Sequence, residues 1–378
     1  MSSVENTLTH ESLQIFTVEQ ATRTFLNIQK MGTPLSAWAN RHIPGRRYTS
    51  HIFNWLGFDN HFQGMARLQN SHYLLVSGGD PHTPMSHLFV IKMASCDQTG
   101  RMNSNLDKKG KPSNNDRIVK ALNIDNTMWH AGGIGVMGDI VSVPIYSARP
   151  KFVNRRQKWA VNSKVVFYTF RDPENPVRLP FEVSIPGGKA YATALTQLDD
   201  GHFLLAVWRN NNKKESGRSD KRRLDLYVSR AKTFDDGFEQ RTTTWFQSEV
   251  QAVQSLKPEF RDYQSISCVR QNDGKLFLIG THNSGKWTPT FSRHNEADLF
   301  QVDLPATQQL KTGGISNPGV RITRVASKRF SSKLFDFRYN MDAAACTYID
   351  AAGRLFIYSA YHWLRKGRVN FMEFGALT

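Results

Sequence analysis

Side chains that can move protons stand at the starts of several short predicted strands. His130 and Asp342 precede runs of small residues, "HAGG" and "DAAA", and His61 starts a similar strand. Imidazole titrates near neutral pH, so a histidine that faces a carboxylate can transfer a proton. A tyrosine hydroxyl such as that of Tyr263 can donate a hydrogen bond to a developing oxyanion. These four residues are therefore the predicted catalytic residues.

Other polar and aromatic side chains occupy equivalent positions, beside these strand starts or at the ends of the strands that follow. Each of them alone is compatible with a structural hydrogen bond to a neighbouring strand, but together they indicate a polar site. The predicted ligand-binding residues are Gln63, Trp129, Tyr146, Tyr191, Trp208, Arg209, Gln264, His282, Tyr361 and His362.

The strands that carry these residues form an internal repeat. A strand rich in small residues, a tight turn and a very apolar strand occur together five times, as in "YATALTQLDDGHFLLAVWR". Each pair is followed by a third strand of alternating polarity, and weaker fourth strands follow four of the units. The third strands start 60 to 77 residues apart, at Ser86, Ser163, Arg223, Glu296 and Gly367. Units of three or four strands at this spacing are typical of a β-propeller.

This pattern resembles the five-bladed β-propellers, an architecture shared by tachylectin-like lectins and by glycosidases of the arabinanase and fructosidase type. The resemblance covers about residues 50 to 378 and is one of architecture, without a family-specific motif. It implies an all-β fold in which the first strand of each blade lines a central channel and the strand starts share one mouth. Such glycosidases need at least two carboxylates, whereas the innermost strands here offer Asp342 and no glutamate.

The N-terminal residues are expected to complete the ring. The fifth unit lacks a fourth strand, and the segment "YTSHIFNW" (48–55) lies at the right distance to supply it. A capping-box pattern from Thr17 to Gln20, followed by helical spacing, predicts a helix before it. We therefore expect an N-terminal extension with one helix at 1–47 and a single propeller domain at 48–378. Five blades are favoured, and six is the alternative if residues 1–50 form a degenerate copy.

The basic charge is concentrated in two predicted mouth loops. The formal net charge is +17, which favours anionic ligands or polyanions. Within these loops, the residues predicted to steer anions are Arg155, Arg156, Arg222 and Arg223. The alternative is that these loops are solvated and only aid solubility. On the opposite face, the polar loop at 107–116 is predicted to be disordered.

The remaining composition excludes several classes of protein. The three cysteines, Cys96, Cys268 and Cys346, have neither the number nor the spacing of a disulfide framework, so we expect reduced thiols. A secretory leader and a membrane span are absent from the pattern, which favours a cytoplasmic protein. No HxH or HExxH spacing predicts a metal site, and no nucleotide or phosphate motif identifies a cofactor.

Three functions remain compatible with these features. The favoured one is a small polar or anionic ligand bound in the channel mouth, with acid–base chemistry by His, Asp and Tyr if the protein is an enzyme. The alternatives are a protein-interaction scaffold and a nucleic-acid-binding propeller that uses its basic loops. The blades carry different residues at their strand starts, which suits one asymmetric site better than five copies of one sugar pocket.

Overall fold

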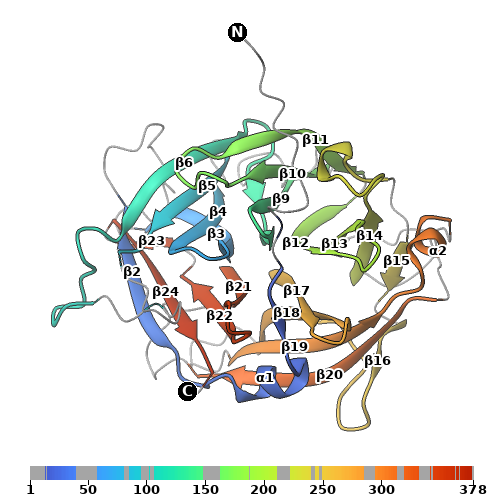
Figure 1. Cartoon of the computed structure of the whole chain (residues 1–378). Coiled ribbons are helices and arrows are strands. Elements are labelled where there is room, and N and C mark those ends of the chain that lie inside the picture. Colours follow the sequence, from blue (N-terminus) through green and yellow to red (C-terminus); the bar gives the residue numbers. More distant parts are fainter. Residues whose placement is uncertain are drawn as a thin grey trace, which may run out of the picture.

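The five repeats fold into antiparallel blades around a common axis (Figure 1). The computed structural model describes residues 13, 15–39, 58–80, 85–94, 102, 106–147, 162–186, 188–210, 222–239, 243–246, 249–284, 294–312, 319–331, 341, 344–361, 363–365 and 367–376. These residues form four sheets, and the largest sheet contains two blades. The protein is an all-β, five-bladed propeller, which confirms the prediction from the repeat.

The first two blades contain the strands nearest the opening histidines. Blade one consists of β3 (Phe58–Arg67), β4 (Tyr73–Asp80), β5 (Met85–Lys92) and β6 (Arg117–Asp125). In blade two the innermost strand is interrupted, so that two short strands pair with the same neighbour. Blade two consists of β7 (His130–Ala131), β8 (Gly135–Met137), β9 (Ile140–Tyr146), β10 (Ser163–Thr169) and β11 (Val177–Ile185).

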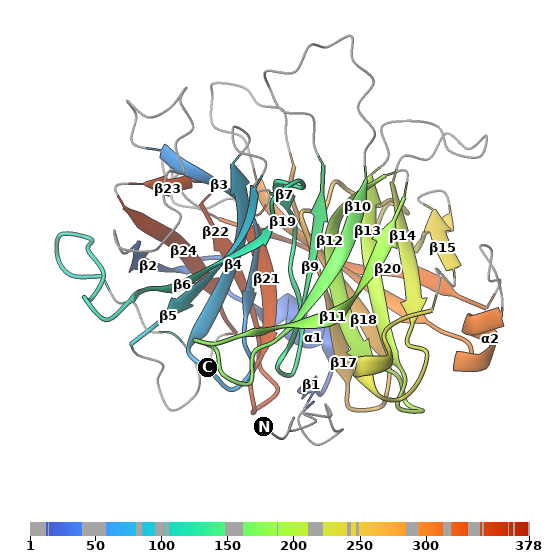
Figure 2. The same cartoon turned by 90° about the horizontal axis from the view of Figure 1, so that it is seen from above.

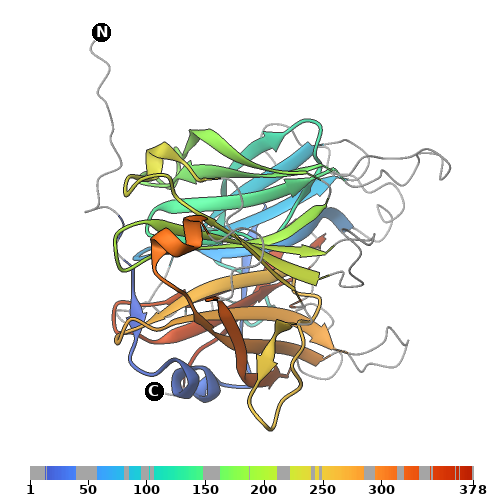
Figure 3. The same cartoon turned by 90° about the vertical axis from the view of Figure 1, so that its right-hand side faces the viewer.

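Blades three and four follow the same order from the axis outward. Blade three consists of β12 (Lys189–Gln197), β13 (Phe203–Asn210), β14 (Arg222–Val228) and β15 (Thr243–Phe246). Blade four consists of β17 (Ser265–Gln271), β18 (Leu276–Ser284), β19 (His294–Asp303) and β20 (Arg321–Phe330), with β16 (Gln251–Ala252) beside β20. A short helix, α2 (Thr307–Thr312), follows β19 and lies on the outside of the ring (Figure 3, orange).

Blade five is completed by a strand from the N-terminal part of the chain. Its strands are β21 (Ala344–Ile349), β22 (Leu355–Ala360), β24 (Arg368–Phe374) and β2 (Thr33–Trp38). A short hairpin strand, β23 (Trp363–Arg365), pairs with β24 and with β3 of blade one, which joins the two blades into one sheet. Ring closure by an N-terminal strand is therefore correct.

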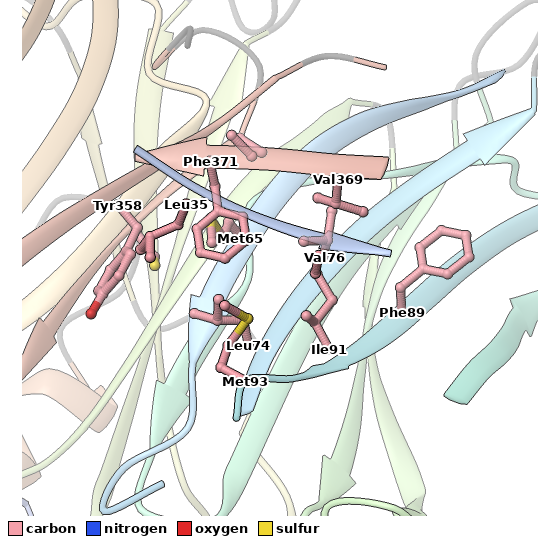
Figure 4. Packing of buried hydrophobic residues seen from close by; sticks show 14 of the residues in the cluster. Leu35, Met65, Leu74, Val76, Phe89, Ile91, Met93, Tyr358, Val369 and Phe371 are labelled. Carbon is pink, nitrogen blue, oxygen red and sulfur yellow. The ribbon is translucent and has the colours of Figure 1, made fainter. Parts of the chain in front are cut away.

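The identity of the closing strand corrects the sequence prediction. β2 pairs antiparallel with β24, with Leu35 opposite Phe371, whereas the predicted strand at 48–55 lies outside the described residues. Leu35 and Phe371 are both fully buried in one hydrophobic cluster (Figure 4). The segment "TPLSAW" buries Leu35, Ser36 and Ala37, so it supplies a buried outer strand to the fifth blade. The predicted boundary at residue 47 also lies outside the described residues.

The predicted N-terminal helix is present, but its cap differs. α1 (Ala21–Asn27) buries Ala21 and Phe25, and Phe25 packs in one cluster with Phe330 and Phe374. Thr17 does not cap the helix, because it lies in β1 (Thr17–Val18), which pairs in parallel with β17. The backbone N–H of Ala21 instead donates to Gln271 Oε1 at 2.8 Å. The capping-box prediction is therefore wrong, and the helix start is held by blade four.

The loop at 107–116 is ordered, contrary to the prediction of disorder. Asp107 Oδ1 accepts hydrogen bonds from the backbone N–H groups of Lys109 and Lys111, both at 2.8 Å. The Arg368 guanidinium donates to the carbonyl of Gly110 at 2.7 Å. Its low hydrophobicity suggested disorder, but local turn hydrogen bonds and bonds from Arg368 and Trp38 of blade five fix this loop.

Candidate functional site at the channel mouth

Two glycines after His130 bring the innermost strands into backbone contact. The Gly133 N–H donates to the Tyr191 carbonyl at 2.7 Å, and the Thr193 N–H donates to the Gly133 carbonyl at 3.0 Å. A Cβ on Gly133 would lie 2.4 Å from the Gln264 carbonyl oxygen. Since Gln264 belongs to the start of blade four, this neck joins blades two, three and four. The small residues after His130 therefore permit the close approach of the innermost strands at the axis.

A small cavity lies on one side of this neck. It measures about 50 Å³ and is lined by the innermost strands of all five blades together with Ile15 and Phe16. Two of its polar groups are already engaged, because Arg67 donates to the Tyr358 hydroxyl at 2.6 Å and Arg270 pairs with Asp199. This cavity lies near the C-terminal ends of the first strands, at the end of the ring that carries β1 (Figure 2). It is distinct from the predicted mouth.

On the other side of the neck, aromatic rings from blades two and three form a continuous cluster. The His130 ring stacks on Tyr146, with 4.3 Å between centroids and 25° between planes. The ring centroids of Trp129 and His130 are 4.9 Å apart, and those of Tyr191 and Tyr146 are 5.4 Å apart. These four predicted residues are therefore brought together. We call them, together with Lys189, the mouth cluster.

Lys189 is the member of the mouth cluster that the sequence prediction missed. It starts β12, two residues before Tyr191, and its Nζ lies 5.6 Å from the centroid of the Tyr146 ring. Burial lowers the pKa of this half-buried amine from its usual value. The available signal was a lysine directly before a strand start in "GGKAY". A lysine in this position is more often read as a solvated loop residue.

The two phenols of the mouth cluster are neutral hydrogen-bonding groups. Burial raises the pKa of Tyr146 well above 10.0, and its hydrogen bond to Tyr191 adds to this effect. Burial also raises the pKa of Tyr191, to which the charge of Asp262 contributes. Neither phenol is therefore ionised near neutral pH. Tyr146 is buried and Tyr191 is half-buried, so Tyr191 is the one that can present its hydroxyl oxygen to a ligand.

The structure places Tyr263 inside the interface between blades three and four, which corrects its predicted catalytic role. Its hydroxyl donates to Asp298 Oδ2 at 2.7 Å, and its side chain is 2% exposed. The ring lies directly over Gly280, where a Cβ would be 2.6 Å from Tyr263 Cδ1. The absence of a side chain at Gly280 makes room for this ring. Tyr263 is a buried structural residue.

His282 is buried in the same network. Its Nε2 lies 3.3 Å from Asp298 Oδ2 and 3.7 Å from Glu296 Oε2, and Arg324 also pairs with Asp298. Burial by itself raises the pKa of Asp298, but hydrogen bonds and charge from His282, the charge of Arg324 and the hydrogen bond from Tyr263 outweigh it and lower that pKa to about 2. The prediction that His282 binds ligand is therefore corrected: His282 is a buried residue whose ring lies against Asp298 and Glu296.

Trp208 and Arg209, predicted to bind ligand, are also buried between blades. Trp208 is 1% exposed and packs edge-on against Phe260 and Tyr263. Arg209 donates to Asp225 Oδ2 at 2.8 Å and to the Pro186 carbonyl at 3.1 Å. The prediction is therefore corrected, and both are structural residues. Successive side chains of a strand point to opposite faces of the sheet, so those of a blade's second strand face the two neighbouring blades in turn.

The two predicted anion-steering arginines that are described already have carboxylate partners. Arg222 forms a bidentate pair with Asp262, at 2.6 and 2.7 Å. Arg223 is buried, and its Nε lies 3.4 Å from Asp225 Oδ1. Their steering role is therefore corrected, since a paired guanidinium adds little long-range field.

The other predicted residues are less informative. Gln63 is buried at a bulge in β3, whereas Gln264 and Tyr361 are half-buried. His61 lies in β3 opposite Gly79, but its side chain is outside the description. Four predicted residues lie outside the described residues altogether: Arg155, Arg156, Asp342 and His362.

Metal and thiol chemistry find no support in the described part of the chain. No three His, Cys, Asp or Glu side chains within it come close enough together to hold a metal ion. Cys268 and Cys346 are free thiols, and burial raises the pKa of both, that of Cys268 to about 12. Protonated thiols are poor nucleophiles. Within the described ranges, no helix has the length and apolarity needed to cross a membrane.

Comparisons with known proteins found similar chains among solved structures alone. No family model and no curated protein sequence matches the chain. Among solved structures, a GH43_1 enzyme from Xanthomonas citri is 10% identical, with a TM-score of 0.45 over 91% of this chain and 90% of that one. An α-L-arabinanase from Penicillium chrysogenum, solved with arabinobiose, is 10% identical with a TM-score of 0.41 over 91% and 99%. A levansucrase mutant from B. subtilis is 13% identical, with a TM-score of 0.40 over 87% of this chain and 85% of that one. At these values the similarity is one of overall shape.

Proposed function

We propose that the protein binds a small polar ligand at the mouth cluster. The observation that carries this proposal is the continuous group of Trp129, His130, Tyr146 and Tyr191 at one end of the channel, closed below by the Gly132–Gly133 neck. Small-molecule sites typically combine apolar or aromatic walls with a few polar groups that fix orientation. The mouth cluster has both.

The polar groups of the cluster favour a ligand that offers hydrogen-bond acceptors. Lys189 supplies an ammonium group, and the neutral phenol of Tyr191 can donate or accept. The ring faces suit a flat apolar surface, such as a planar ring or the C–H face of a sugar. The ligand class that fits is therefore a small, oxygen-rich organic molecule with one flat face.

If this site is catalytic, His130 is the described residue suited to proton transfer. Of the other predicted catalytic residues, Tyr263 is buried in a different interface, and the Asp342 and His61 side chains lie outside the described residues. His130 is 8% exposed and stacked on Tyr146. It is held rigidly, as a residue that positions a ligand or a proton would be.

Calorimetric titration with a defined panel tests the proposal. The panel contains monosaccharides, uronic acids, hydroxybenzoates and nucleosides. We expect one class to bind the natural protein, and His130→Ala to weaken that binding at least about tenfold, a change of roughly 1.4 kcal/mol. His202→Ala is the matched control, because His202 pairs with Asp200 in a turn at the far end of blade three.

Two outcomes would contradict the proposal. One is that His130→Ala and Tyr191→Phe both bind the panel compound as the natural protein does. The other is that His130→Ala is strongly destabilised and yet binds normally when folded, which would make His130 a tie between blades.

We also propose a cytoplasmic location. The supporting observation is that both described cysteines are free thiols, as is usual in a reducing compartment. Fractionation of expressing cells, with the tagged full chain, tests this location.

A further inference from the structure

The mouth cluster contains a positive charge that has no ion-pair partner among the described residues. Lys189 is half-buried, and none of its contacts within the described residues is an ion pair. A charged amine that loses hydration without gaining a carboxylate is energetically unfavourable. Among the described residues, its Nζ lies 5.6 Å from the centroid of the Tyr146 ring, and a cation over such a ring gains about 0.5 to 2 kcal/mol. The unmatched charge therefore needs an explanation.

The described acidic residues in β14 and just before β17 already pair with other cations. Asp225 is shared by Arg209, at 2.8 Å, and Arg223, at 3.4 Å, so two guanidinium groups face one carboxylate. Arg209 lies opposite Ala190, the residue that follows Lys189. Among the described residues of this part of blade three, positive charges therefore outnumber negative ones.

The other described carboxylate near the mouth cluster is Asp262, whose negative charge contributes to the raised pKa of Tyr191. It is held by the bidentate pair with Arg222, with distances of 2.6 and 2.7 Å. Arg222 also donates to the Phe260 carbonyl at 2.9 Å, which fixes the pair at the edge of blade four. Asp262 is therefore not available to balance Lys189.

We propose that Lys189 binds a carboxylate of the ligand while the flat face of that ligand lies against the mouth cluster. The inference rests on the function proposed above and specifies its ligand class as organic carboxylates. An ammonium group makes its strongest hydrogen bonds to ionised acceptors, and a half-buried site weakens the screening of this attraction by salt. Lys189 is in this account the residue that selects acids over their neutral analogues.

Two matched pairs of probes test the selection. Galacturonate carries a carboxylate where galactose carries a hydroxymethyl group. Similarly, 4-hydroxybenzoate carries a carboxylate where 4-hydroxybenzamide carries a neutral amide. We expect at least one acid to bind the natural protein tenfold or more tightly than its neutral partner. Lys189→Met should remove this difference, and Lys189→Arg should retain most of it.

A control separates the local charge from the net charge. Lys232→Met removes one positive charge at an exposed position beyond β14 and should leave the acid preference unchanged. The unfolding temperature of Lys189→Met should equal or exceed that of the natural protein, because the variant lacks a half-buried charge that has no ion-pair partner among the described residues. The same measurement would show whether Lys189→Met loses binding only because it does not fold. In that case Lys189→Arg is the deciding variant, and loss of the acid preference in a folded Lys189→Arg protein would overturn the inference.

The outcomes distinguish this inference from the proposed function. Equal binding of acids and neutral partners, with loss in His130→Ala, would overturn the role of Lys189 and keep the site. Preference for acids that survives in Lys189→Met would also overturn it. If neither acid binds, the inference fails, and binding of any other panel compound that is sensitive to His130→Ala keeps the proposed function.

Discussion

The backbone N–H of Gly133 donates to the carbonyl of Tyr191 at 2.7 Å, which joins the innermost strands of blades two and three. This contact separates the mouth cluster from the cavity at the other end of the channel. In the proposed site, this backbone contact would form the floor on which a ligand rests.

Gly133→Ala is expected to destabilise the fold. The new Cβ would lie 2.4 Å from the Gln264 carbonyl oxygen and 2.8 Å from Ala192 Cβ, so strands must move apart. Overpacking of this kind costs roughly 1–3 kcal/mol, measurable by urea unfolding. Gly110→Ala is the control: no atom lies within 4 Å, and only its φ of +69° opposes the change, at about 1 kcal/mol. Equal losses in both variants would contradict a packed neck.

Acid should weaken the fold through Asp298. Its pKa is lowered to about 2 in the folded protein, from 3.8. A carboxyl with a depressed folded pKa stabilises the fold above its unfolded pKa, and this contribution is lost as pH falls from about 4 to about 2. Urea unfolding across this window should show a smaller pH dependence in Asp298→Asn than in the natural protein.

The same variant should be less stable at neutral pH, because His282 and Arg324 lose their shared partner. Removal of one member of a buried ion pair costs about 3–5 kcal/mol. Glu19→Gln changes an exposed carboxylate and should keep both the stability and the pH slope of the natural protein. An unchanged slope in Asp298→Asn would show that Asp298 is not the titrating group.

Tyr358→Phe should cost stability without removing a ring. The Tyr358 hydroxyl accepts from Arg67 at 2.6 Å and donates to Glu373 Oε2 at 2.6 Å, and all three side chains are buried. The loss of a buried hydroxyl that satisfies two charged groups is expected to cost about 1–3 kcal/mol. Tyr168→Phe is the control, since Tyr168 is also a buried residue and its hydroxyl makes no hydrogen bond within the described residues. Equal effects on thermal unfolding would contradict this assignment.

Leu35→Ala should loosen the ring closure. Leu35 is fully buried against blade five, and such truncations cost about 2–5 kcal/mol. Pro34→Ala changes the exposed neighbour on the same strand and should have little effect. Calorimetric unfolding compares the two. A mild effect of Leu35→Ala would mean that β2 is not needed to close the propeller.

Residues with a local signal were predicted well. The five repeated hairpins and the helix around Phe25 follow from alternation, glycine turns and helical spacing, which depend on near neighbours in the chain. Four of the predicted site residues, Trp129, His130, Tyr146 and Tyr191, do lie together, because equivalent strand starts meet at one end of a propeller. In blade four, Tyr263 stands at the equivalent strand start and His282 at the equivalent end of the next strand, and yet both lie in an interface between blades.

The sequence by itself determined the number of blades, the strand order and the end of the ring where polar strand starts gather, since hydrophobic periodicity and turn chemistry act over short distances. Only the tertiary structure decided which N-terminal segment closes the ring, because β2 is defined by its pairing with β24. It also decided that Tyr263 donates to Asp298 inside a blade interface and that Lys189 has no ion-pair partner among the described residues. Both outcomes depend on side chains more than 30 residues apart or on different blades, whose contacts are set by how the sheets pack.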